Sequence, residues 1–256
     1  MEDFLDSVLN YNKDNNVSEE DMEREIREKI REGFISKVYG IISYQIFITL
    51  IIVYLGLVNS WFQNLLFNST VIFFANIAIT FVCLILPIFC PQIYQKVPTN
   101  YIILTIFTIS YSCIVSAETC FYTVSSVMIS LFLTLITVLA LTYYARKTKT
   151  DFTITGGSLF VSSILLIFSC LFFILFRIPF FNLIIMFLSL VLFSIYLIYD
   201  TQLLIGKRRN KFSEDDYILA AINIYIDIVV LFLKILRLFG EKKREKEKKE
   251  KEKNKN

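Results

Sequence analysis

Two aspartates stand in apolar stretches where a carboxyl group is costly. Asp227 lies inside AINIYIDIVVLFLK (residues 221–234), and Asp200 ends the earlier run FLSLVLFSIYLIYD (187–200). An ionised aspartate at the centre of a membrane helix costs about 2.5–3.5 kcal/mol on insertion scales, so such a residue usually faces a cavity or a partner. Both aspartates are therefore candidates for a functional site.

Helical spacing places the two carboxyl groups at similar depths. Asp227 lies ten residues into its apolar segment, about 15 Å along a helix axis, and Asp200 lies six residues, about 9 Å, before Gly206. If these segments are adjacent antiparallel helices, the two carboxyls can meet. Because two like charges cannot both ionise cheaply in a low dielectric, the pair is expected to share a proton and to titrate as a unit.

The same pair suits a hard cation. Ca²⁺ prefers carboxylate and carbonyl oxygens, so Asp200 and Asp227 are predicted to contact it. Asn223 lies one helical turn before Asp227 on the same face and could complete a site. Glu118, near the end of an apolar segment, is a further candidate for an ion path, although its position also fits an exposed loop acid.

A structural alternative exists for each aspartate. Asp227 could be a neutral carboxyl bonded to Tyr, Asn or Ser on neighbouring helices. Asp200 could be a helix-end acid in contact with headgroup water. The polar positions elsewhere in the apolar segments are predicted to join helices by hydrogen bonds rather than to line a pore; they are Thr105, Thr108, Ser112, Thr134 and Thr137.

Most other chemistry is excluded by residue type and spacing. There is no histidine, which removes the usual general base and metal ligand, and the five cysteines lack C-x-x-C spacing. No H-E-x-x-H, G-x-S-x-G or P-loop occurs, and the aspartates lack the G-x-G-D context of intramembrane proteases. A retinal protein using Lys234 is disfavoured because Asp227 lies about 10 Å away along the helix. The sequence therefore predicts neither an enzyme nor an obligatory cofactor.

The elements that position these residues are membrane helices. Apolar residues make up 55% of the chain, and no charged residue occurs between Val38 and Gln95. A bilayer core takes about 20 apolar residues per helix. The apolar runs predict an all-α integral membrane protein with seven transmembrane helices, at 34–58, 71–90, 101–117, 124–145, 156–176, 180–205 and 217–239.

The charged ends define three regions. Residues 1–33 are predicted to form a cytosolic arm, dispensable for folding and ion passage up to residue 31, with a short charged helix that Ser18 caps. Residues 34–240 form the transmembrane domain, and 241–256 a charged tail expected to be disordered or loosely helical. Gly206 is a predicted helix C-cap and Ser213 a predicted N-cap. Lys234 and Arg237 are expected to snorkel to the far interface.

Basic residues in the short loops predict a cytosolic N-terminus. With that orientation, the outer loops carry one basic residue, Arg177, and the inner loops carry eight: Lys96, Arg146, Lys147, Lys149, Lys207, Arg208, Arg209 and Lys211. The tail opposes this assignment, since seven crossings place its nine basic residues outside, although five glutamates accompany them. Seven full crossings are favoured, with incomplete spanning by the last segment as the alternative.

Three stretches resemble the Bax-inhibitor family of transmembrane proteins, lifeguard branch: REGFISKVYGIISYQIFITL, ARKTKTDFT and YDTQLLIGKRRNKFSEDDYILAAINIYIDIVVLFLKILRLFG. The resemblance runs from about Phe34 to Gly240. It implies six helices around a central seventh, calcium leak from internal stores and restraint of cell death. It also implies that Asp200 and Asp227 form a carboxylate pair that responds to pH.

The chain departs from that pattern at two positions. Segment 71–90 has no basic residue, whereas some bacterial members have one there that can latch the acidic pair. Many lifeguard relatives carry a glutamate where Tyr111 aligns, and the nearest acid here is Glu118.

The expected function is a pH-sensitive calcium-leak channel of the endoplasmic reticulum or Golgi membrane. Its expected partners are lipids, Ca²⁺ and apoptosis-regulating membrane proteins, without nucleic acid. The alternative is a membrane scaffold that modulates apoptosis through protein partners and transports no ion. The scaffold should tolerate Asp227→Asn, whereas the channel should not.

Overall fold

The structure is a computed structural model that describes residues 19–176, 178–206 and 212–244, together with positions 246, 248 and 251. Seven of the helices in this part of the chain are long and apolar enough to cross a membrane. They are α2 (Glu19–Val58), α4 (Thr70–Phe89), α6 (Thr99–Thr119), α7 (Val124–Lys147), α8 (Gly156–Phe176), α9 (Pro179–Ile205) and α10 (Tyr217–Phe239). The predicted all-α membrane protein with seven transmembrane segments is confirmed.

Two short helices occupy stretches that the sequence analysis left between segments: α3 (Ser60–Asn68) and α5 (Pro91–Gln95). The side chain of Asn59 caps α3 by accepting hydrogen bonds from the backbone N–H groups of Trp61 and Phe62, at 3.0 and 3.2 Å. Pro91 begins α5 at a position where its missing N–H costs no helical bond. Two 3₁₀ turns, η1 (Phe152–Thr155) and η2 (Glu214–Asp216), precede α8 and α10.

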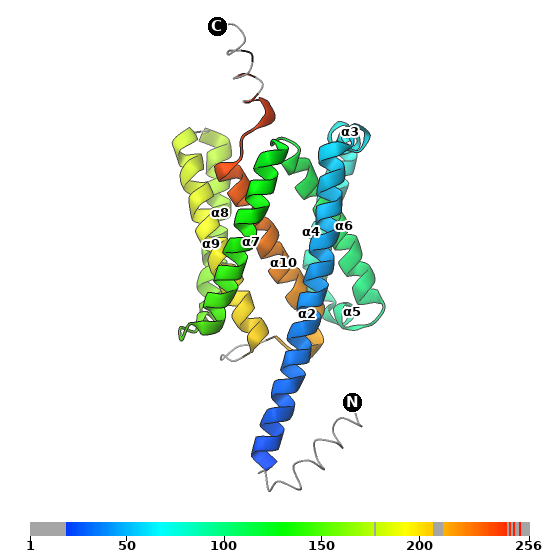
Figure 1. Ribbon diagram of the computed structural model, residues 1–256, viewed down its shortest axis with the longest axis vertical. Helices are drawn as coiled ribbons and strands as arrows, with labels where there is room; N and C mark the ends of the chain where they lie inside the picture. The colour runs from blue at the N-terminus through cyan, green and yellow to red at the C-terminus, as the bar shows by residue number, and fades with distance from the viewer. Residues whose placement is uncertain are drawn as a thin grey trace.

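Helix α10 is the central element of the bundle. In the most apolar stretch of α10, 61% of the residues are buried, whereas only 6% are buried in the most apolar stretch of α8. Figure 1 shows α10 running diagonally between one group made of α2, α4 and α6 and another made of α7, α8 and α9. Among the long helices, those that pack closely on it are α2, α6, α7 and α9, whereas α4 packs mainly on α6 and α8 on α9. The central position of the C-terminal helix is thus confirmed, with α4 and α8 in an outer layer.

Helix α2 is a single helix of 40 residues that extends beyond the bundle (Figure 1). The predicted short charged helix is therefore the first part of the first transmembrane helix, and Ser18, its predicted cap, lies outside the described residues. Surface ion pairs one turn apart, such as Arg24 with Asp21 at 3.0 Å and Lys29 with Glu25 at 2.7 Å, accompany this extension.

The C-terminal end of α10 lies at the opposite end of the bundle from the start of α2 (Figure 1). The chain beyond α10 is fixed to the turn between α6 and α7, because Thr123 N–H donates to the carbonyl of Glu241 at 3.1 Å and Lys243 N–H to that of Phe121 at 3.0 Å. The start of the predicted tail is thus held by backbone hydrogen bonds.

The two predicted caps around the α9–α10 loop differ in outcome. Gly206 ends α9 with φ +71°, and its N–H donates to the carbonyl of Gln202, as expected for a glycine C-cap. The prediction for Ser213 is wrong in its mechanism: its side chain makes no capping hydrogen bond. The turn η2 separates Ser213 from the first residue of α10, so its hydroxyl is not placed at the start of that helix.

Candidate functional site: a buried carboxyl pair

The carboxyl groups of Asp200 and Asp227 lie within hydrogen-bonding reach of each other, between α9 and α10. Asp200 is in the last two turns of α9 and Asp227 in the middle of α10. The two residues are 6% and 4% exposed, so neither reaches the protein surface. The structure therefore brings together the two acids that helical spacing predicted to meet.

No cation neutralises this pair within the described residues. The ion pairs found there involve Asp21, Glu23, Glu25, Glu214 and Glu118, and neither of the paired aspartates. The Oδ2 atom of Asp227 is buried and receives no hydrogen bond from a donor group of the described chain. A proton held between the two carboxyls would remove one of two like charges.

A column of buried polar side chains lies between α2, α6 and α10. The hydroxyl of Thr49 lies 2.7 Å from that of Tyr225 and 2.8 Å from that of Ser112. One turn away, the amide of Gln45 donates to the hydroxyl of Thr108 at 3.2 Å. The prediction that polar residues join helices is confirmed for Thr108 and Ser112, and for Thr105, whose hydroxyl lies 3.3 Å from that of Tyr44. It is wrong for Thr134 and Thr137, whose hydroxyls donate to carbonyls of their own helix. The contributions of Gln45 and Tyr225 were not predicted, because an apolar segment gives no signal of which face its polar residues occupy.

Tyr111 lies beside Asp227, at the position where lifeguard relatives were expected to carry a glutamate. Its ring stacks on Phe107, with centroids 5.7 Å apart, and meets Tyr225 edge-on at 5.9 Å. The position is thus occupied by an aromatic cluster rather than by a third acid. An aromatic wall of this kind excludes water from one side of the carboxyl pair.

Gln202 holds the end of α9 in place. Its side-chain amide donates to the carbonyls of Ala145 and Thr150, at 3.3 and 3.0 Å, and its oxygen accepts the N–H of Phe152 at 2.8 Å. These hydrogen bonds reach the last turn of α7 and the segment that joins α7 to α8. Gln202 is two residues from Asp200, so these bonds also position the first acid of the pair.

Asn223 does not join the aspartates. Its side chain is exposed and lines a cavity of about 280 Å³ between α4 and α10, together with Pro87 and Asp216. This corrects the expectation that Asn223 completes the site: one helical turn brings it to a neighbouring angle on α10, but that angle faces α4 rather than α9.

Glu118 also lies apart from the pair. It forms an ion pair with Arg237 at 3.0 Å, at the end of the bundle that carries the C-terminal segment. A cavity of about 460 Å³ there is lined by both residues and by Lys242 and Arg244. Glu118 is about 10 Å along α6 from Tyr111, so it could act only at a separate point of an ion path. Arg237, expected to snorkel, makes a defined contact instead.

The pair alone is a poor resident metal site. No group of three His, Cys, Asp or Glu side chains comes together anywhere in the described ranges. Ca²⁺ takes about 6–8 oxygen ligands, and two carboxyl groups supply at most about four. The pair would therefore need further oxygen ligands to hold Ca²⁺, and the predicted calcium contact at Asp200 and Asp227 stays a prediction.

Comparison with known proteins agrees with the resemblance found in the sequence. A family model described as inhibitor of apoptosis-promoting Bax1 matches residues 31–244. Protein lifeguard 3 of Mus musculus is 30% identical over 225 residues, which cover 84% of this chain and 71% of the mouse protein. The human protein lifeguard 3 is 28% identical over 225 residues, and LIFEGUARD 4 of Arabidopsis thaliana is 35% identical over 231 residues, covering 82% of this chain and 85% of the plant protein.

The matched region includes α2 from residue 31 onward, the other six long helices in full and both members of the carboxyl pair. With its multi-pass helical architecture and its match over most of its length, this chain belongs to the Bax-inhibitor family of apoptosis-inhibiting membrane proteins.

Proposed function

We propose that this protein is a pH-sensitive calcium-leak channel of internal membranes that restrains cell death, with Asp200 and Asp227 as its gate. The endoplasmic reticulum or the Golgi is the proposed location, with the N-terminus in the cytosol. Membrane lipids surround the protein, and Ca²⁺ is the permeant ion rather than a cofactor. The family consists of non-enzymatic membrane proteins, and no catalytic role is proposed.

The observation that carries this proposal is the isolation of the carboxyl pair. Two buried acids without a cationic partner in the described chain can be kept together at low cost only by a shared proton. In this view the closed state is the singly protonated pair. Acid adds a second proton and breaks the contact, so calcium flux is expected to rise as the pH falls.

The test is calcium efflux from proteoliposomes at several pH values. Asp200→Asn and Asp227→Asn keep the size of the side chain but leave a single acid, which should flatten the pH response or shift it by about one unit. The double variant should lose the pH dependence and still insert, because an amide costs less in lipid than an ion. Asp21→Asn, at an exposed aspartate on the α2 extension, is the matched control. Identical pH profiles for all of these proteins would refute the gate.

A scaffold without ion transport is the second candidate. It is favoured by the charged part of α2 that extends from the bundle, a surface suited to protein partners (Figure 1). A scaffold requires the helices to fold but does not require titration of Asp227. Protection from cell death by Asp227→Asn at wild-type level, with normal insertion, would favour the scaffold over the channel.

A further inference from the structure

We propose that Arg31 is a lock on the acid-bearing helices, and that its release opens the path at the carboxyl pair. The lock is the set of contacts between the Arg31 side chain on α2 and the two ends of the α9–α10 loop. These ends, at Leu203 and Phe212, are called the neck of the loop. The effect of the lock on ion flux rests on the proposed channel function, whereas its effect on the packing of α9 and α10 does not.

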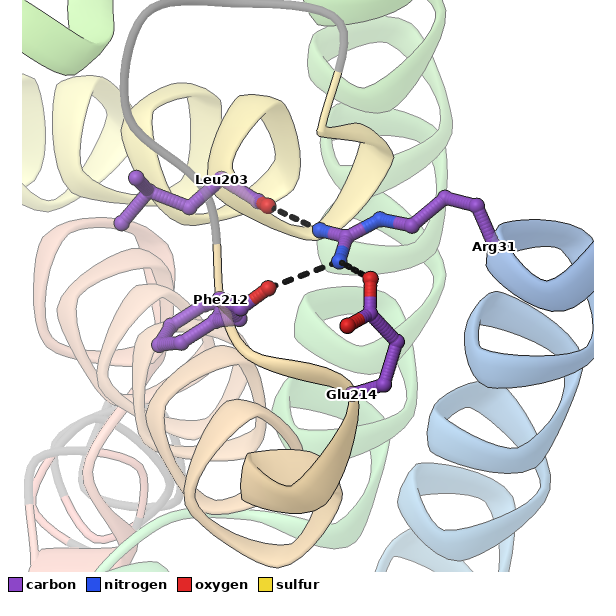
Figure 2. Close-up of polar contacts among 4 residues, drawn as sticks. All are labelled: Arg31, Leu203, Phe212 and Glu214. Atoms are coloured by element: carbon purple, nitrogen blue, oxygen red, sulfur yellow. Dashed lines mark hydrogen bonds and ion pairs between the residues drawn. The ribbon is translucent and has the colours of Figure 1, made fainter. Parts of the chain in front are cut away.

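Arg31 bonds to both sides of the loop neck (Figure 2). Its Nη2 atom donates to the carbonyl of Leu203 at 2.6 Å, and Nη1 donates to the carbonyl of Phe212 at 2.7 Å. Nη1 also lies 3.4 Å from the carboxylate of Glu214. Since Phe212 N–H donates to the same Leu203 carbonyl at 3.2 Å, the guanidinium closes a ring of hydrogen bonds across the neck.

The Arg31 guanidinium is packed into the protein rather than exposed on its surface. The Arg31 side chain is 11% exposed, and its Cζ atom lies 4.6 Å from the centre of the Phe34 ring, in cation–π geometry. A Cβ atom on Gly206 would come within 2.5 Å of Nε, so a glycine is required there for this contact as well as for its positive φ. Because the Arg31 side chain is largely buried and has several contacts, it contributes more to stability than an exposed ion pair does.

The charge of Arg31 also suits its position. The Leu203 carbonyl is one of the last four of α9, which have no partner within the helix and form the negative end of its dipole. A planar fork can reach two carbonyls at once, whereas a lysine ammonium acts as a single point charge. The contact is therefore specific for arginine.

The lock lies one turn along α9 from Asp200, the first member of the carboxyl pair. Leu203 is three residues after Asp200 on α9, and Glu214 opens the turn η2 that leads into α10. Holding Leu203 and Phe212 together fixes where α9 ends relative to where α10 begins. This sets the approach of the two carboxyls, so Arg31 acts as a positioning residue for Asp200 and Asp227.

This contact opposes the expectation that residues 1–31 are dispensable. Arg31 belongs to the charged extension of α2, yet it reaches residues 172 and 181 positions later in the chain. A protein that binds or bends the α2 extension would therefore displace Arg31 from its contacts with the loop.

Hydrogen exchange tests the structural half of the proposal. In Arg31→Gln, the amides of residues 200–206 and 212–220 should exchange at least tenfold faster than in the wild type. Gly206→Ala, which displaces the guanidinium from the other side, should have the same effect. The control is Arg27→Gln, one turn earlier on α2, where the arginine pairs with Glu23 on the surface. Unchanged exchange in Arg31→Gln or Arg31→Lys overturns the lock.

Calcium flux tests the functional half. Arg31→Gln should raise flux at neutral pH several-fold and move the pH profile toward higher pH. A chain that begins at Glu28 should behave as the wild type, and one that begins at Glu32 as Arg31→Gln. If Arg31→Gln exchanges faster but has an unchanged flux profile, the lock does not control the gate. A wild type without flux at any pH refutes the proposed channel, and the exchange data then decide alone whether Arg31 holds the helices.

Discussion

At the scale of single residues, the bundle is shaped by polar atoms that must find partners without water. Pro87 lies inside α4 and has no N–H, so the carbonyl of Cys83, four residues earlier, loses its helical donor. The buried hydroxyl of Tyr94 donates to that carbonyl at 2.5 Å. An unpaired carbonyl in a membrane helix costs several kcal/mol, so the proline is tolerated because α5 supplies this hydroxyl.

Tyr94→Phe should therefore destabilise the protein. The substitution keeps the ring in its pocket and leaves the Cys83 carbonyl buried without a donor, at an expected cost of about 1–3 kcal/mol. Thermal unfolding in detergent measures this as a lower melting temperature. Tyr143→Phe, at a tyrosine that is 65% exposed, should melt as the wild type does. Equal melting temperatures for both variants would mean that another donor reaches the Cys83 carbonyl.

At the scale of helices, small residues allow α2 and α6 to approach closely. Ser116 on α6 and Cys120, the residue that follows α6, donate hydrogen bonds to the carbonyls of Ile52 and Gly56 on α2, both at 3.1 Å. A Cβ atom on Gly56 would lie 2.0 Å from the hydroxyl of Ser116, so no larger residue fits without a shift. Close contacts of this type stabilise helix pairs in membranes, where the hydrophobic effect does not draw them together.

Two glycines of α2 provide a matched test of this contact. Gly56→Ala should lower stability by about 1–3 kcal/mol, since the new methyl group must displace the Ser116 hydroxyl from its hydrogen bond to Ile52 or push α6 away. Gly40→Ala, with nothing within 4 Å of its added Cβ, should be neutral or slightly stabilising because alanine favours a helix. The melting temperatures of the two variants in the same detergent give the comparison. A loss of stability for Gly40→Ala as large as that for Gly56→Ala would contradict this account of the interface.

The apolar runs predicted the long helices because each crossing needs a fixed length of apolar chain, a local property of the sequence. The helix α3 was not predicted because Asn59 and Ser60 have the residue types of both turns and helix caps. The approach of Asp200 to Asp227 was predicted from spacing and a short loop. The contacts of Arg31 and the outward face of Asn223 depend on which helices are neighbours, which spacing along one segment does not determine.

At the scale of the whole molecule, the carboxyl pair lies where the two groups of helices meet. Asp227 is carried by α10, between the groups, and Asp200 by α9, which belongs to the second group (Figure 1). The column of Thr49, Ser112 and Tyr225 joins α10 to the first group. Any movement of one group against the other must therefore change either the polar column or the carboxyl pair, which is a suitable arrangement for a gate.

The membrane topology of the whole chain gives the last prediction. Helix α10 has 23 residues, about 35 Å, which is enough to cross a hydrocarbon core of about 30 Å. The loop before it and the segment after it should then lie on opposite sides. In a chain whose exposed Cys90 and Cys170 are replaced by alanine, a cysteine at Ser213 should react with an impermeant reagent from the cytosolic side, and one at Lys246 only from the other side.

This topology places the basic tail outside the cytosol. The positive-inside rule alone would keep its nine basic residues in the cytosol. The feature that favours their translocation is the bias of the short loops, which carry eight basic residues on the inner side and one on the outer side. A cysteine at Glu25 on the α2 extension serves as the control and should label from the same side as Ser213 (Figure 1). If the cysteines at positions 213 and 246 react from the same side, α10 does not cross the membrane. The central helix would then have to enter and leave by the same face.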